Sequence, residues 1–219
     1  LVGSEMCIRD SNGNACLFGA LKNIDLGAYD SLVVGPGIGI DNDDWQKSKD
    51  YLIGFEGLLI LDADALNRIS ESKLGSKFFL ERKFKTWITP HTKEFSRLFP
   101  KIKCDTNVGQ ALKAAQDFNI SVLLKGANSI VADNKKAWQL YGTDSQTARA
   151  GLGDLLSGFV AGSSAIDLTL CRNITTDFFA KYVLLHSYAA SKCKKGSTAS
   201  LIGDELSKLI RKSKVRQMS

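Results

Sequence analysis

The sequence alternates short apolar runs with amphipathic segments from residue 31 onward. Apolar runs of strand length occupy 31–35, 57–61, 121–126, 129–133 and 137–142, the last two as a hairpin around Asn134. Helical spacing is found at 43–53, 106–118, 153–166, 174–192 and 203–213, and 86–99 combines a strand, a Pro/His turn and a helix. Such alternation predicts an α/β fold: one three-layer α/β/α domain with a mostly parallel central sheet.

Five polar motifs follow the predicted strands. They are 35-GPGIG-39, 61-LDADALN-67, 89-TPHTKE-94, 125-KGANS-129 and 151-GLGD-154. In parallel α/β sheets a ligand binds beyond the carboxyl ends of the strands, so all five loops are expected at one edge. Their convergence is a stronger signal than any single motif, and it predicts the site there.

The GLGD motif enters a predicted helix. Glycines at Gly151 and Gly153 leave backbone N–H groups unobstructed, and with the helix dipole these groups form a site for an anion. Asp154 beside a bound phosphate can accept a proton from a substrate hydroxyl. A glycine turn with Asp154 as a simple helix cap explains the same four residues equally well.

Two further motifs carry ionisable side chains. Lys125 follows a buried strand and precedes a glycine, which suits contact with nucleotide phosphates, although a surface lysine before a hairpin turn is the simpler alternative. His91 follows a proline turn and can donate or accept a proton near neutral pH; its alternative is a turn residue. The other histidine, His186, is expected to be packed or half-exposed on a helix.

The remaining motifs are weaker. Asp62 and Asp64 stand two residues apart at a strand end, so one can face a ligand or a metal-bound water, and Asp64 is expected to cap the next helix. The 35–39 glycine turn is too short for a dinucleotide or Walker pattern. Farther along, Asp43 or Asp44 is expected near the cap of the 43–53 helix.

Composition narrows the function classes. The 219 residues carry a net charge of +6, which suits an anionic ligand, but no basic stripe with interleaved aromatics indicates nucleic-acid binding. The five cysteines show no metal-binding or CxxC spacing and indicate a reducing, cytoplasmic compartment. No apolar run in the sequence is read as membrane-spanning, and neither a membrane nor a nucleic-acid partner is expected.

Taken together and in order, the five motifs resemble those of the ADP/ATP-dependent NAD(P)H-hydrate dehydratases of the ribokinase-like superfamily. The resemblance covers about residues 31–192, and His91 and Asp154 distinguish the pattern from that of related vitamin-precursor kinases, which usually show TPN and often GxGC. It implies a hydro-lyase that repairs hydrated NADH or NADPH at the expense of ADP, giving AMP and phosphate, or of ATP. Mg²⁺ is then held mainly by phosphates and water, with no metal ligand assigned in the chain. A homo-oligomer, a tetramer by resemblance, is also implied.

The resemblance assigns roles residue by residue. Asp154 is the base that accepts the hydroxyl proton, and it also contacts the substrate. The other expected substrate contacts are Gly37, Gly39, His91 and Asp62. The expected nucleotide contacts are Lys125, Gly126, Ala127, Asn128, Ser129, Gly151 and Gly153.

The chain departs from the family pattern in several places. Arg149 and Leu152 replace small or hydroxyl residues, and Thr92 and Lys93 replace the frequent Pro-Gly. We expect residues 1–10 to be a non-native or disordered start, and 11–219 to be a single domain that lacks its N-terminal part. Two alternatives stay open: a ribokinase-like kinase of a small hydroxylated metabolite or vitamin precursor, and an inactive nucleotide-binding fragment.

Overall fold

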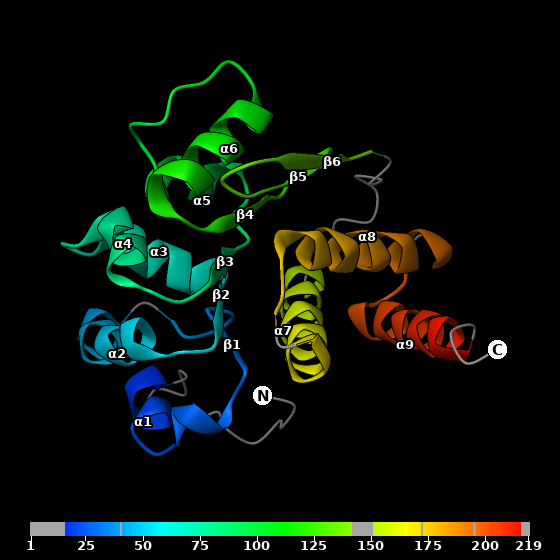
Figure 1. Cartoon of the computed structure of the whole chain (residues 1–219), viewed down its shortest axis with the longest axis horizontal. Coiled ribbons are helices and arrows are strands. Elements are labelled where there is room, and N and C mark those ends of the chain that lie inside the picture. The colour runs from blue at the N-terminus through cyan, green and yellow to red at the C-terminus, as the bar shows by residue number, and fades with distance from the viewer. Residues whose placement is uncertain (1–15, 40, 142–150, 172, 195, 216–219) are drawn as a thin grey trace.

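A computed structural model describes residues 16–39, 41–141, 151–171, 173–194 and 196–215. These residues form three layers, with a central sheet between two groups of helices (Figure 1). Helices α1 to α6 cover one face of the sheet, and α7 to α9 lie on the other side. The layered α/β/α architecture predicted from the sequence is confirmed.

The sheet has six strands in the order β1-β2-β3-β4-β5-β6. Their bounds are β1 Ser31–Val34, β2 Leu58–Leu61, β3 Thr86–Ile88, β4 Ser121–Leu124, β5 Ser129–Ala132 and β6 Ala137–Leu140. The first four strands pair in parallel, while β5 and β6 are antiparallel, so the predicted hairpin is confirmed. The carboxyl ends of β1 to β4 therefore meet at one edge of the sheet.

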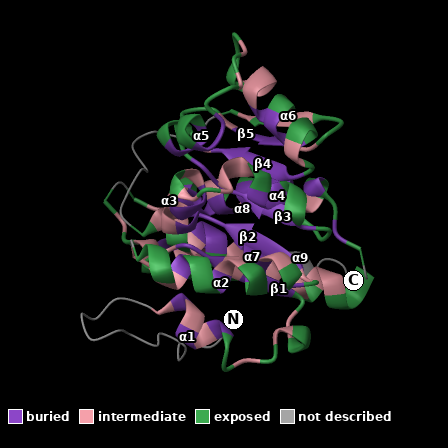
Figure 2. Cartoon of the chain, turned by 90° about the vertical axis from the view of Figure 1, so that its left-hand side faces the viewer, coloured by how far each residue is buried: buried purple, intermediate pink, exposed green. Residues whose placement is uncertain are grey.

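The strands are apolar on both faces because helices cover both. Along β2, Leu59 and Leu61 pack into the core on the α1–α6 side, whereas Leu58 and Ile60 pack on the α7–α8 side. Side chains of a strand alternate between faces, so a strand buried on both sides reads as a continuous apolar run. Figure 2 shows these buried strands behind helices whose outer faces are exposed.

The helices of the first layer alternate with β1 to β4 along the chain. Its helices are α1 Leu17–Leu21, α2 Asn42–Gly54, α3 Ala63–Glu71, α4 Phe78–Glu81, α5 Thr92–Leu98 and α6 Asn107–Phe118, with 3₁₀ turns η1 Leu26–Ala28 and η2 Gly75–Lys77. The expected cap of α6 is confirmed, because Thr106 accepts a hydrogen bond from the Gly109 N–H. The short helices α1 and α4 were not expected from the sequence.

Asp43 and Asp44 lie in the first turn of α2, near its cap as predicted. Its N-cap is Asp41, which accepts hydrogen bonds from the N–H groups of Asp43 and Asp44. Asp44 instead reaches α1, where its carboxylate accepts from Leu17 N at 2.8 Å and Phe18 N at 2.9 Å. No sequence pattern predicted α1, so the partners of Asp44 could not be predicted either.

The second layer contains α7 Leu152–Cys171, α8 Thr176–Lys192 and α9 Ala199–Val215. Helices α7 and α8 pack on the sheet, and α9 packs on α8 and α7. By length and composition α7 is apolar enough to cross a membrane, whereas no membrane-spanning segment was predicted from the sequence. Its buried Leu156 and Val160 belong to the same apolar core as Leu58 and Ile60 of β2.

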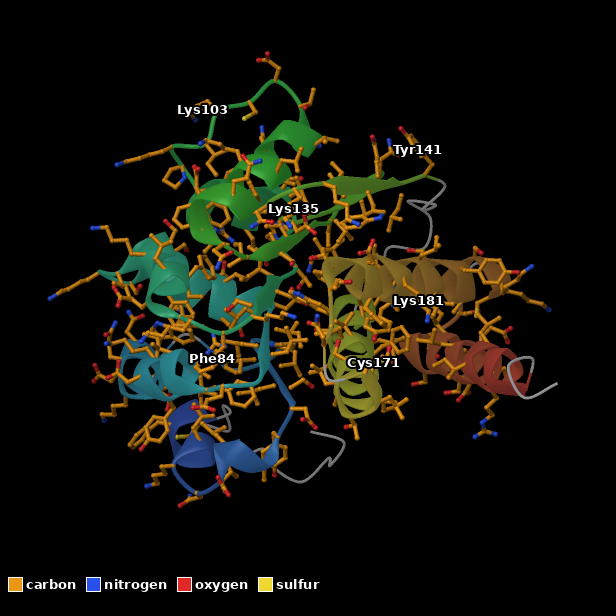
Figure 3. All side chains as sticks on the ribbon, viewed as in Figure 1. Phe84, Lys103, Lys135, Tyr141, Cys171 and Lys181 are labelled. Atoms are coloured by element: carbon orange, nitrogen blue, oxygen red, sulfur yellow. The ribbon has the colours of Figure 1, made fainter. Side chains whose placement is uncertain are left out.

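Strand β6 is the last strand at one edge of the sheet and ends at Leu140. Tyr141 is 76% exposed at the outer end of that strand (Figure 3). Arg149 lies outside the described residues. The glycine motif that follows begins at Gly151, the residue before α7.

Candidate active site

Backbone hydrogen bonds tie the ends of the four parallel strands together. Asp62 N donates to Val34 O at 3.1 Å, and Thr89 N donates to Leu61 O at 3.1 Å. Lys125 N donates to Pro90 O at 2.8 Å. Four of the five predicted motifs are therefore neighbours at the carboxyl edge of the sheet.

The 35–39 turn packs directly on the β2 loop. Gly35 has φ of +139°, and a Cβ added there would lie 1.7 Å from the Asp62 carbonyl oxygen, so only glycine fits. Gly39 N donates to Asp64 Oδ2 at 3.1 Å. Gly37, with φ of +70°, also requires the left-handed conformation that favours glycine.

The cap of α3 reverses the sequence expectation. Asp62, not Asp64, is the N-cap, since its Oδ1 accepts from the Ala63 N–H at 2.8 Å. Asp64 lies in the first turn of α3 and holds the 35–39 loop instead. On an extended strand the two carboxylates would point to the same side, but the helix begins between them and separates their roles.

Asp62 is the centre of a buried polar cluster that consists of Asp62, Lys125 and Ser157. Its side chain is 2% exposed, and its Oδ1 pairs with Lys125 Nζ at 2.8 Å. Ser157, from α7, donates to Asp62 Oδ2 at 2.6 Å. The fifth motif thus joins the other four, because Gly153 borders this cluster: a Cβ on it would lie 3.8 Å from Asp62 Oδ2 and 3.9 Å from Lys125 Nζ.

Asp154 lies in the first turn of α7 and is exposed. Its side chain lines an apolar pocket of about 310 Å³, whose wall includes Gly35, Pro36 and Ile38. The preceding Gly151 has φ of +79°, a value that a side chain disfavours. Asp154 therefore faces the pocket of the first motif, and its neighbour Gly153 borders the ammonium of Lys125.

His91 is the N-cap of α5. Its Nδ1 accepts from Lys93 N at 3.1 Å and Glu94 N at 3.3 Å, while Glu94 Oε2 accepts from His91 N at 2.8 Å. Since Nδ1 is an acceptor, the ring proton resides on Nε2, 3.3 Å from Glu94 Oε1. The ring is 48% exposed at the site edge. The turn-residue role of His91 is therefore confirmed. His91 also lies beside Lys125, with which it forms a parallel bridge. Its contact with the substrate stays a prediction.

A second pocket adjoins the predicted nucleotide loop. It measures about 460 Å³ and is lined by Gly126, Ala127 and Asn128 together with the start of α6. Ser129 closes the loop, because its hydroxyl lies 3.2 Å from Gly126 O and 3.4 Å from Gly126 N. All the residues expected to contact nucleotide are thus in two adjoining segments, 125–129 and 151–153, at one edge of the sheet.

The comparisons with known proteins bear on the identity of this site. A family model described as NAD(P)H-hydrate dehydratase matches residues 9–212. The chain belongs to the NAD(P)H-hydrate dehydratase family.

Relatives within this family are bifunctional NAD(P)H-hydrate repair enzymes. That of Methanopyrus kandleri is 32% identical over 155 residues, which is 66% of this chain and 28% of the relative. That of Gloeobacter violaceus is 35% identical over 159 residues, or 70% of this chain and 28% of the relative. The chain therefore spans little more than a quarter of the length of these curated relatives.

Solved structures agree on the fold. The ADP/ATP-dependent NAD(P)H-hydrate dehydratase of Bacillus subtilis superposes with a TM-score of 0.66 at 20% identity, over 89% of this chain and 71% of that one. A ribokinase-like superfamily protein of Enterococcus faecalis gives 0.70 at 21% identity, over 90% and 66%. The predicted ribokinase-like fold is confirmed.

Sequence reasoning missed one residue of the candidate site, Ser157. It lies four residues after Gly153, so helical spacing places both on the same side of α7. The other histidine, His186, is buried on α8, and burial lowers its pKa to about 4, an effect that a hydrogen bond with the Leu152 backbone opposes. Within the described ranges, no group of three or more His, Cys, Asp or Glu side chains is arranged to hold a metal ion.

Proposed function

We propose that this domain dehydrates hydrated NADH or NADPH back to NAD(P)H and uses ADP, giving AMP and phosphate, or ATP as the phosphoryl donor. One observation carries the proposal: Asp154 lines the pocket beside the 35–38 loop, while the adjacent Gly153 borders Lys125. A carboxylate between an apolar pocket and a basic, glycine-lined surface suits transfer of a phosphoryl group to a bound hydroxyl. The family assignment supports the same reaction.

In the proposed reaction Asp154 accepts the proton of the hydroxyl on the hydrated nicotinamide ring. The hydroxyl oxygen then attacks the terminal phosphorus of the donor, and the bond from that phosphorus to the bridging oxygen breaks. The ring nitrogen pushes its electron pair toward the phosphorylated carbon, inorganic phosphate leaves, and a proton is lost as the double bond re-forms. A base at Asp154 fits this scheme because its exposed carboxylate, unlike that of Asp62, makes no ion pair among the described residues.

The donor is proposed to bind along segments 125–129 and 151–153. The Lys125 ammonium has three donors, of which one is directed to Asp62, so two are available to a phosphate. The start of α7 adds backbone N–H groups and the positive end of the helix dipole. The pocket of about 460 Å³ beside Gly126 is of a size that accepts a nucleobase or sugar.

Hydrated dinucleotide is proposed to bind opposite, against Gly37, Gly39 and His91. The described side chains do not form a carboxylate cage for Mg²⁺, so we propose that Mg²⁺ enters with the nucleotide phosphates. Asp62 was also predicted to touch the substrate, but its side chain is only 2% exposed. A cytoplasmic, homo-oligomeric enzyme is the setting that we propose for this reaction.

The test is recovery of NADH absorbance when the purified chain is incubated with hydrated NADH, Mg²⁺ and either ADP or ATP. The proposal predicts recovery that requires a nucleotide, with stoichiometric release of inorganic phosphate. A phosphorylated product that persists without recovery indicates a ribokinase-like kinase of a small metabolite. Nucleotide binding without either product indicates an inactive nucleotide-binding domain.

A further inference from the structure

The carboxylate of Asp62 is almost fully enclosed and accepts three hydrogen bonds within the protein. Its Oδ1 accepts from Ala63 N and from Lys125 Nζ, both at 2.8 Å, and its Oδ2 accepts from Ser157 Oγ at 2.6 Å. The side chain is 2% exposed, and Ser157 is 0% exposed. Asp62 therefore has little surface to offer a substrate.

The three partners of Asp62 come from three different parts of the site. Ala63 begins α3, Lys125 follows β4, and Ser157 lies in α7. A buried carboxylate is held by strong, short hydrogen bonds, and the loss of one partner leaves it uncompensated. The cluster thus fixes the Lys125 ammonium relative to the first turn of α7.

Ser157 carries this connection back to the glycine motif. Its hydroxyl lies 2.6 Å from Asp62 Oδ2 and 3.0 Å from Gly153 O. A hydroxyl has a single proton, and the shorter, charge-assisted contact with the carboxylate takes it. Ser157 therefore anchors the first turn of α7, including Gly153, to the carboxylate that also holds Lys125.

We propose that Asp62 and Ser157 are positioning residues, which act on the phosphoryl donor through Lys125 and the start of α7 and not by touching the substrate. The proposal rests on the nucleotide site of the proposed function. It is independent of which hydrated dinucleotide is used, and of whether turnover follows binding. Because Ser157 acts by fixing the start of α7 relative to the Lys125 ammonium, its effect on nucleotide binding requires Lys125.

The experiment is a double-mutant cycle read by calorimetric titration with ADP and Mg²⁺. Ser157→Ala is expected to weaken ADP binding about tenfold, in the range of a lost charge-assisted hydrogen bond. Lys125→Met is expected to weaken it by more, and adding Ser157→Ala to Lys125→Met is expected to change it little further. Such non-additivity is the signature of residues that act through one another.

Two variants separate positioning from general damage to the fold. Ser164→Ala changes an equally buried serine on the same helix, outside the cluster, and is expected to leave ADP binding unchanged. Asp62→Asn keeps the shape of the side chain and removes its charge, so it is expected to weaken ADP binding in a chain that melts as a single folded species. If Ser157→Ala does not fold, Asp62→Asn alone tests the cluster.

Normal ADP affinity in Ser157→Ala and Asp62→Asn, or effects of Ser157→Ala and Lys125→Met that multiply, would overturn the positioning role. A KM for hydrated NADH that rises in Asp62→Asn at unchanged ADP affinity would overturn it in favour of direct substrate contact. Failure of the unaltered chain to bind ADP would overturn both this inference and the proposed function. ADP binding with the expected coupling but no NADH recovery would overturn only the proposed function.

Discussion

His186 makes the stability of the fold sensitive to mild acid. Burial on α8 lowers its pKa from the ordinary value of 6.5 to about 4, so the native chain keeps it neutral while the unfolded chain takes up a proton. The stabilisation is complete above pH 6.5 and is lost as the pH falls from there toward 4. Its Nε2 is buried and has no hydrogen-bond partner among the described residues, so none of them favours the charged form at that nitrogen.

The magnitude follows from proton linkage. Between about pH 7.5 and about pH 5, these two pKa values correspond to a loss of about 2 kcal/mol in the free energy of unfolding. For a chain of this size, a loss of about 2 kcal/mol lowers the melting temperature by roughly 4–8 °C. The variant His186→Leu removes the titrating group, so it is expected to lose about 2 kcal/mol less over the same pH interval.

The assay is urea unfolding of both chains at the two pH values, followed by tryptophan fluorescence. Carboxylates that titrate near the lower pH are common to both chains, so their contribution cancels in the comparison. The change in packing energy that His186→Leu causes does not depend on pH, so it also cancels when the losses over the pH interval are compared. Equal losses of unfolding free energy in wild type and His186→Leu would refute the assignment of a neutral, buried His186.

Substitutions at Gly35, His91 and Asp44 test the geometry of the site and its support. Gly35→Ala is expected to destabilise the fold by about 3 kcal/mol or more, because the new Cβ meets the Asp62 carbonyl, whereas Gly54→Ala meets nothing and is expected to be neutral in chemical unfolding. His91→Ala is expected to lose about 1 kcal/mol of capping energy and to raise KM for hydrated NADH. His91→Asn, which retains a capping side chain, should restore stability and not KM; recovery of both would limit His91 to capping. Asp44→Ala is expected to speed hydrogen exchange at the first two N–H groups of α1, and unchanged exchange would contradict that anchoring.

The fold was predictable because its signals are local and repeated. The β2 run 58–61 is apolar at every position, as a strand covered on both faces must be, and its polar successors had to emerge at a strand end. The hairpin at 129–140 and the Thr106 cap follow from short-range turn and capping chemistry. Because β1 to β4 are parallel and adjacent, the four motifs that follow them lie at one edge of the sheet. The fifth motif joins them where α7 begins.

What the sequence did not provide are contacts whose partners are distant in the chain. The choice of Asp62 over Asp64 as cap depends on where α3 begins, and one residue of difference exchanges their roles. The Ser157–Asp62 hydrogen bond joins residues 95 positions apart in the chain. The hydrogen bonds of Asp44 reach α1, a five-residue helix that no strong periodic pattern predicts. Such contacts are set by how the layers pack, and a single sequence carries little direct information on that.

The central claim is that Asp154 is the base of a nucleotide-dependent dehydration. The most direct measurement is NADH recovery from hydrated NADH by wild type and Asp154→Asn, with ADP affinity measured on the same preparations. We predict that the variant loses turnover by about a hundredfold or more, in the range of a lost general base, while ADP affinity changes little. Turnover retained by Asp154→Asn, or lost only in proportion to ADP binding, would contradict the account.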